Sequence, residues 1–300
     1  MNKRECGCSS HPKASRTVRP ILSAGTVASV SYAVINDTNA AFINGQFGTN
    51  GMASYVEFDN GSMVDIADAS AQTVALAAST GNTASVGDAY RIRAHFTIAS
   101  IFGTNNEVSL LPGLNPATAD NIIIHVPETQ QTITVFYYPN APYAGWYHAD
   151  FTPAGDQVVY PEEGLMVRRK ASTDAHVYLC GPIKIGVALA PVVPGYNLVG
   201  TLKSLSSLSL AALNLYTGNP ATGLAYGLNP NLGDNLLVVQ PDGSTATYFY
   251  YKNDNVLGGP EGWADAAFNF VPDVQIKAGS ALFVLRKAQQ GGFTWTIPAE

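Results

Sequence analysis

The feature that most constrains this chain is an internal repeat, which builds much of its second and third hundred residues from two copies of one pattern. The segment Gly113–Asn121, GLNPATADN, returns as GLNPNLGDN at Gly227–Asn235, 114 residues later. An apolar segment follows each copy, III at 122–124 and LLV at 236–238. A long, fixed period indicates one supersecondary unit that is used twice.

Three further blocks repeat in the same order: an aromatic strand, a Gly-Trp pair and a strand that ends in basic residues (TVFYY at 134–138 and TYFYY at 247–251; Gly145-Trp146 and Gly262-Trp263; GLMVRRK at 164–170 and ALFVLRK at 281–287). The spacing between matching blocks stays between 113 and 117 residues. We therefore expect each copy to fold as a small antiparallel meander of strand, turn, aromatic strand, Trp loop and final strand.

The rest of the chain also has the pattern of β-structure. Short runs rich in Val, Ile, Thr, Tyr and Phe alternate with Gly, Pro, Asn and Asp. Asp59-Asn60-Gly61 lies between two such runs and predicts a hairpin. We also expect strands at 26–35, 73–78 and 89–93. The leucines of 202–215 mix helical and alternating spacing, so the structure of that stretch stays open.

We predict an all-β fold of internally duplicated antiparallel β units, small sandwiches or barrels, with an extended N-terminal arm. The expected divisions are the arm (1–20), an N-terminal β unit (21–95), repeat unit 1 (96–195) and repeat unit 2 (196–300).

Composition limits the class of function. Only 13% of the residues are charged and the net charge is −6. The one cluster of Lys and Arg lies in the N-terminal arm, where a charged tail is the ordinary interpretation, so we expect no nucleic-acid partner. A surface with few full charges suits close packing against a neighbouring molecule or a sugar, because little charge must be desolvated. No apolar run reaches the length of a transmembrane helix, so we expect no membrane span.

The cysteines do not form a disulfide framework. A Cys6–Cys8 bridge would be strained, and these two residues with His11 lack the four ligands of a structural zinc site. The redox and metal state of Cys6 and Cys8 stays open. Cys180 lies in an apolar run and is expected to be a small buried hydrophobic residue. We predict no metal and no cofactor.

No familiar catalytic motif occurs. The chain has no H-E-x-x-H, no G-x-S-x-G elbow and no phosphate-binding glycine loop. Asp65 and Asp68 lack the companion residues of an EF-hand and are expected to solvate a turn. We predict that the protein is not an enzyme.

Glycosidase carboxylates can be far apart in sequence, so Glu57, Glu162, Glu163 and Glu261 are not excluded from such a role. Glu162 and Glu163 follow Pro161 in an expected turn, where solvated acids are ordinary.

Aromatic residues are the best candidates for a ligand site or an interface. Trp146 and Trp263 each follow a glycine and are expected to fold back over the meander as a lid, packed in the core or at its rim. The alternative is a stacking platform for a sugar ring. The preceding strands place aromatics on both faces, which keeps the phenol groups of Tyr138 and Tyr251 within reach of water. These four residues are our predicted ligand or interface residues.

Two segments carry a family resemblance. TVRP at 17–20 with GTVASV at 25–30, and GDAYRIRAHFTIASIF at 87–102, resemble uncharacterised secreted β-rich proteins of Verrucomicrobia and related bacteria, and the likeness extends over residues 17–298. The resemblance implies export and a β-rich fold, and it implies no activity. It also implies that His95 and Phe96 lie at the joint between the N-terminal unit and the first repeat.

These observations predict a non-catalytic structural or assembly protein at the cell surface or outside the cell, such as a subunit of a filament, sheath or surface layer. Its main partner would be another copy of itself. The alternative is a module that binds polysaccharide or another cell-surface ligand. Family members usually begin with a signal peptide, whereas residues 1–16 here are polar and basic, so no export signal is evident.

Overall fold

The computed structural model describes residues 19–49, 51–78, 84–173, 175, 177, 186–199, 208–240, 243–253, 259–271, 273–276 and 280–297. The predictions for Cys6, Cys8, His11 and Cys180, and for most of the N-terminal arm, concern residues outside these ranges. Within them the fold is all-β, as predicted: antiparallel strands form several sheets, and none of these closes into a barrel. No helix in the described part of the chain has the length and apolar character needed to cross a bilayer.

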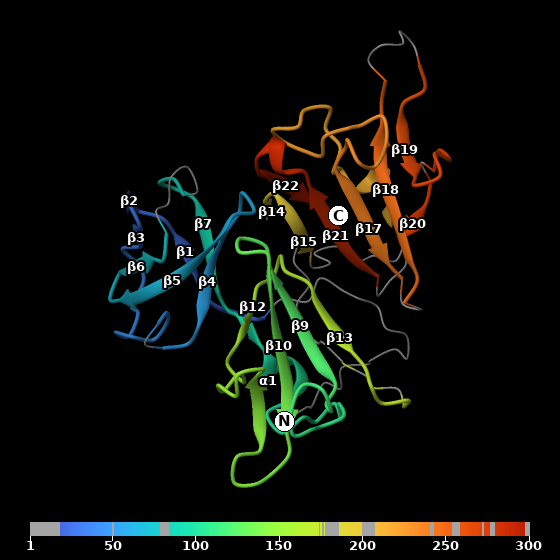
Figure 1. The fold of residues 1–300 in the computed structure, drawn as a ribbon. Coiled ribbons are helices and arrows are strands. Elements are labelled where there is room, and N and C mark those ends of the chain that lie inside the picture. Colours follow the sequence, from blue (N-terminus) through green and yellow to red (C-terminus); the bar gives the residue numbers. More distant parts are fainter. Residues whose placement is uncertain are drawn as a thin grey trace, which may run out of the picture.

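The N-terminal unit is one seven-stranded sheet in the order β1-β7-β4-β5-β6-β3-β2. Its strands are β1 (Ile21–Thr26), β2 (Ser29–Ser31), β3 (Val34–Asn36), β4 (Ser54–Phe58), β5 (Met63–Ser70), β6 (Thr73–Leu76) and β7 (Ala89–Ala94). The predicted hairpin is confirmed, because β4 and β5 pair across the turn at 59–62. The run expected as one strand at 26–35 instead bends into a β2–β3 hairpin around Tyr32, whose φ is +49°. Figure 1 shows this unit as a separate lobe.

The two repeats fold alike. Repeat 1 contains β9 (Asn121–Val126), β10 (Gln131–Tyr138), β11 (Gly145–His148) and β13 (Leu165–Arg168), in the sheet order β11-β10-β9-β13. Repeat 2 contains β17 (Asn235–Val239), β18 (Thr245–Tyr251), β19 (Gly262–Asp265) and β21 (Ala281–Arg286), in the order β19-β18-β17-β21. Even the register agrees, since Tyr137 lies opposite Trp146 and Tyr250 lies opposite Trp263. The internal duplication read from the sequence is therefore also a structural one.

Smaller elements complete the repeats. In repeat 1 they are β8 (Phe96–Thr97), which pairs with β12 (Val158–Val159), and the helix α1 (Ile98–Phe102). Their counterparts in repeat 2 are β16 (Leu208–Ser209), which pairs with β20 (Gln275–Ile276), and the 3₁₀ helix η2 (Ala211–Leu213). A second 3₁₀ helix, η3 (Ala288–Gln290), follows β21. Of the stretch 202–215, residues 202–207 lie outside the described residues.

Two strands set the boundary between the repeats. β15 (Gly195–Val199) pairs with β21 and adds a fifth strand to the sheet of repeat 2. β14 (Ala188–Val192) pairs with β22 (Phe293–Ile297), also in repeat 2. The boundary expected at 195/196 therefore falls inside β15, after its first residue, and divides β14 from its partner β22. Residues 188–195 belong with the second repeat. The repeated blocks gave no sign of this, because β14 lies outside them.

A buried aspartate closes each meander in the same way. The carboxylate of Asp120 accepts hydrogen bonds from the backbone N–H of Leu111 at 2.8 Å and of Lys170 at 2.6 Å. Asp234 does the same with Ala225 at 2.7 Å and Lys287 at 2.7 Å. Each carboxylate thus ties the residues just before the Gly-Leu-Asn-Pro loop to the backbone just after the last strand.

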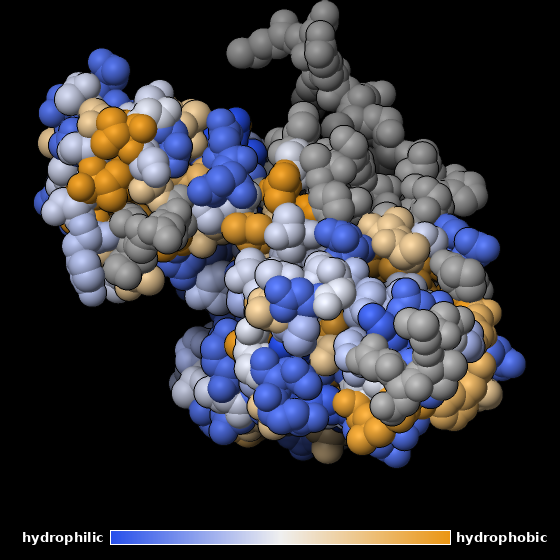
Figure 2. Space-filling model, turned by 90° about the horizontal axis from the view of Figure 1, so that it is seen from above, coloured by the Kyte–Doolittle hydropathy of each residue, from blue (hydrophilic) through white to orange (hydrophobic). Residues whose placement is uncertain are grey.

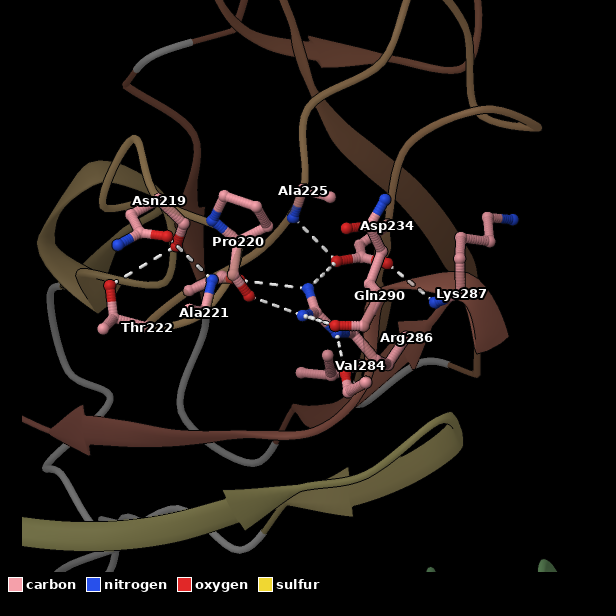
Figure 3. A network of polar contacts seen from close by, with 12 residues as sticks. Asn219, Pro220, Ala221, Thr222, Ala225, Asp234, Val284, Arg286, Lys287 and Gln290 are labelled. Atoms are coloured by element: carbon pink, nitrogen blue, oxygen red, sulfur yellow. Dashed lines mark hydrogen bonds and ion pairs between the residues drawn. The ribbon is translucent and has the colours of Figure 1, made fainter.

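An arginine forms an ion pair with each aspartate: Arg286, the last residue of β21, and Arg169, the residue that follows β13. Arg286 and Asp234 are both fully buried, and Arg286 also donates to the backbone carbonyls of Pro220, Gly223 and Gly291 (Figure 3). In repeat 1 the side chain of Arg169 is 24% exposed. Burial alone would raise the pKa of Asp120, but the backbone N–H groups of Lys170, Leu111 and Ala171, together with Arg169, bring that pKa below its ordinary value.

We expect Asp234→Ala to destabilise repeat 2 by about 3–5 kcal/mol, because it leaves Arg286 as an unpaired buried charge. Urea unfolding followed by tryptophan fluorescence in a Trp146→Phe background reports on repeat 2, which holds the other tryptophans, Trp263 and Trp295. The exposed Asp273 supplies the control: Asp273→Ala should change stability by less than about 0.5 kcal/mol. Equal losses from Asp234→Ala and Asp273→Ala would contradict the assigned role.

Candidate functional site

The two predicted tryptophans lie in the cores of the repeats. Trp146 is 4% exposed and Trp263 is 5% exposed. They belong to strands β11 and β19 and do not form lids over the meander. Each packs edge-on against the tyrosine opposite, Tyr137 or Tyr250. Neither indole has a ring face open to a sugar, so the structure places both in the packing role.

The opposite face of each sheet carries a second aromatic cluster. Phe136 and Phe249 point away from the tryptophans, because neighbouring residues of a strand face opposite sides of a sheet. We call these groups the outer aromatic clusters: Phe136, Tyr138, Tyr147 and Phe151 in repeat 1, and Phe249, Tyr251, Phe268 and Phe270 in repeat 2. The predicted residues Tyr138 and Tyr251 are half-buried members of these clusters.

In each cluster one exposed phenylalanine is held in a strained backbone conformation. Phe151 is 52% exposed with φ of +66°, and Phe268 is 49% exposed with φ of +67°. A bulky residue at positive φ is uncommon and costs roughly 1–3 kcal/mol. Each ring lies edge-on over a fully buried partner, Phe136 at 5.6 Å or Phe249 at 5.7 Å between ring centroids. Both repeats therefore keep the same costly turn and the same half-open ring.

The turns are alike in backbone but differ in the side chain that supports them. The N–H of Phe151 donates to the backbone carbonyl of His148 at 3.0 Å, and the N–H of Phe268 donates to the backbone carbonyl of Asp265 at 3.0 Å. Asp150 accepts from the backbone and hydroxyl of Thr152, which holds the pKa of this carboxyl below its ordinary value. In repeat 2 the supporting carboxylate is Asp265 instead. The two turns are stabilised by different carboxylates, yet they have the same backbone conformation. This conformation is therefore the feature that the repeats share.

Sequence reasoning missed these phenylalanines. Phe151 and Phe268 are 117 residues apart, the same offset as the Gly-Trp pair before them, so the repeat already contained the signal. The surrounding residues, HADFTP and DAAFNF, share little else. The positive φ that singles out both residues cannot be read from residue type.

A second region of interest is the junction of the three units, where residues 160–163 line two adjoining cavities of about 400 and 280 Å³. Toward the N-terminal unit, both oxygens of Asp65 are engaged, by His95 at 3.0 Å and by the Tyr160 hydroxyl at 3.1 Å. Asp65 and Asp68 lie in strand β5 and do not solvate a turn, contrary to expectation. His95 is buried at this joint, where the resemblance placed it.

The carboxyl groups of Glu162 and Glu163 lie in this junction and are partly buried, whereas solvated acids are expected in a turn. Burial raises the pKa of Glu163 to about 7, and the neighbouring acids Glu162, Glu128 and Asp65 add to the rise. Burial likewise raises the pKa of Glu162. Among the described residues no group of three or more His, Cys, Asp or Glu could hold a metal ion.

The other carboxylates named from the sequence are engaged elsewhere. Glu57 forms a buried ion pair with Arg93 at 2.6 Å, and Glu261 lies 3.6 Å from Lys252 on the surface of repeat 2. The structure brings neither of them to the junction.

Trp263 and Phe268 should differ sharply in their effect on stability. We expect Trp263→Ala to cost about 3–5 kcal/mol, because it empties a core site. For Phe268→Gly we expect a net change within about 1 kcal/mol, because the relief of the strained turn offsets the lost ring contact. Urea unfolding in the Trp146→Phe background measures both, with Trp295 as reporter. If Phe268→Gly cost as much as Trp263→Ala, Phe268 would be a core residue and not a surface feature.

Compared with models of known protein families, with curated proteins and with solved structures, this chain matches none.

Proposed function

We propose that this chain is a non-catalytic structural protein of the cell surface or extracellular space. Its copies bind one another through the outer aromatic clusters, so that they assemble into a filament, sheath or surface layer. The observation that carries the proposal is the exposed phenylalanine on a left-handed turn, present in both repeats. A bulky side chain held half-open at an energetic cost needs a purpose beyond the fold, and contact with a neighbour supplies one.

Surface chemistry supports contact with a protein surface. Aromatic residues are enriched where proteins meet, and burying one exposed Phe contributes roughly 1.5–3 kcal/mol. In the view of Figure 2 hydrophobic residues form small separate patches among polar ones, and only 13% of the residues are charged. Little charge must therefore be desolvated when two such surfaces meet.

Because the repeat is duplicated, each chain has the two contact surfaces that assembly requires. A chain with two contact surfaces can bind two neighbours. The surfaces are related but not identical: repeat 1 offers Tyr138, Tyr147 and Phe151, and repeat 2 offers Tyr251, Phe268 and Phe270. If the cluster of repeat 1 binds the cluster of repeat 2 on the next copy, the contact does not close and the chain of copies grows. Localisation outside the cell rests on the family resemblance alone.

Our proposal predicts that Phe151→Asn and Phe268→Asn each abolish self-association. Asparagine tolerates positive φ, so the turn is kept while the ring is lost. Sedimentation velocity over a range of concentrations should show oligomers for the wild type and monomers for either variant. A mixture of the two variants should form dimers and nothing larger, since each variant keeps the surface that the other lacks.

The control is Ile43→Asn, which removes a 72% exposed apolar residue from the N-terminal unit and should leave assembly intact. Wild-type protein that stays monomeric at high concentration would overturn the proposal. So would oligomers that persist in the double variant.

A second function, polysaccharide binding, is favoured by the polar groups beside the exposed rings. Asp150 and Thr152 flank Phe151, and Asn269 follows Phe268 on the same turn. An aromatic ring with neighbouring carboxylate and amide groups is a suitable surface for a sugar.

If sugars bind here, migration of the wild-type protein should slow in native gels that contain the right soluble polysaccharide. The Phe151→Asn/Phe268→Asn double variant should migrate freely. Unretarded wild-type protein across a panel of neutral and acidic polysaccharides would remove this alternative.

A further inference from the structure

The short segment Tyr160–Gly164 of repeat 1 contacts both the N-terminal unit and repeat 2. Its Tyr160 hydroxyl donates to Asp65 of strand β5 in the N-terminal unit, at 3.1 Å. The ring of Tyr160 also packs edge-on against His95, with centroids 5.1 Å apart. At its other end, the Gly164 N–H donates a hydrogen bond to the backbone carbonyl of Leu198 in strand β15 of repeat 2, at 3.0 Å. Glu163 also forms an isolated backbone β-bridge with Val199 of the same strand. One turn of five residues therefore joins all three units.

Gly164 approaches strand β15 closely. A Cβ added to Gly164 would lie 2.8 Å from the side chain of Leu198, so the backbone of the turn and this strand are in direct contact at that position. On the same side, Gln130 of repeat 1 both donates to and accepts from the backbone of Tyr196 at 2.9 and 2.6 Å. The edge of strand β15 is thus held by repeat 1 through these contacts.

Two adjacent carboxyl groups, Glu162 and Glu163, occupy the centre of this joint. The titratable groups that face them are Asp65, His95 and Tyr55 from the N-terminal unit, and Glu128 and Tyr160 from repeat 1. The facing residues of repeat 2 carry no charge (Ala190, Pro191, Asn197, Leu198, Val199). No Lys or Arg lines either cavity among the described residues. Ionised glutamates here therefore meet other carboxylates and low-dielectric surroundings, and the one basic side chain that lines the cavities, His95, is engaged with Asp65.

We propose that Tyr160–Gly164 is a pH-dependent latch. With Glu162 and Glu163 protonated, it holds the N-terminal unit and repeat 2 against repeat 1; when they ionise, the joint loosens and the units move apart. This inference is independent of the proposed assembly function, because it concerns the joint and not the outer aromatic clusters.

The direction in which the stability of the joint changes with pH follows from the linkage between proton binding and closure. In the open joint the glutamates are solvated and titrate near the ordinary value of 4.5, whereas in the closed joint the pKa of Glu163 is about 7. The closed joint therefore binds more protons between these two values. Its contribution to stability is full below about pH 4.5 and is lost as the pH rises toward 7. One pKa unit changes the ratio of closed to open joint about tenfold.

Hydrogen exchange at Gly164 and small-angle scattering test the latch on the full chain. After correction for the intrinsic rate, protection of the Gly164 amide should fall at least about tenfold between pH 5 and pH 8, and the radius of gyration should rise. The neutral double variant Glu162→Gln/Glu163→Gln should stay protected and compact at both values. The surface variant Glu261→Gln should behave as the wild type.

Equal protection and equal size of the wild type at both pH values would overturn the latch. The same pH response in the Gln double variant would overturn it too, because the response would then come from other groups. Near-UV circular dichroism confirms that each variant keeps its packed core before the comparison is made.

Discussion

The buried aspartate of each repeat is the interaction on which the rest of the architecture depends. Asp120 and Asp234 each join a loop that precedes the meander to the residue that follows it, through backbone N–H groups at both ends. A carboxylate removed from water must have its charge and lone pairs satisfied, and here backbone donors and an arginine do so. The four strands between these ends are then confined to one arrangement, the one both repeats share.

This framework gives each repeat two different faces. The inner face carries Trp146 or Trp263 and fills the core, whereas the outer face carries a cluster around Phe151 or Phe268. Two copies of a unit within one chain allow a comparison between related sequences. Features that serve the fold, such as the aspartate and the tryptophan, recur in buried positions. The phenylalanine on the left-handed turn recurs in an exposed one, and this difference motivates the proposal of a contact surface.

Much of the fold could be predicted because its signals are local or repeated. The β-rich alternation, the hairpin at Asp59–Gly61 and the duplication all follow from residue type and spacing. The placement of the tryptophans could not, because Gly-Trp is compatible with both a lid and a strand. The carboxyl groups of Glu162 and Glu163 look like ordinary turn residues in the sequence. Their burial arises only when the three units pack around them, and such long-range packing leaves no mark on local sequence.

The outer aromatic clusters and the junction of the three units lie in different parts of the molecule, and we assign them different roles. The outer clusters lie on the faces of the sheets and are open to a neighbour. The junction lies between the lobes and sets how they sit together (Figure 1). A joint that responds to pH would change the distance between lobes without altering either outer cluster.

The central claim is that each of the two repeats presents a contact surface to a neighbouring copy. Hydrogen–deuterium exchange compared between dilute and concentrated protein tests it most directly. Our account predicts added protection in two matched segments, 145–153 and 262–271, with the N-terminal unit unchanged. Protection confined to the N-terminal unit, or no dependence on concentration, would contradict it.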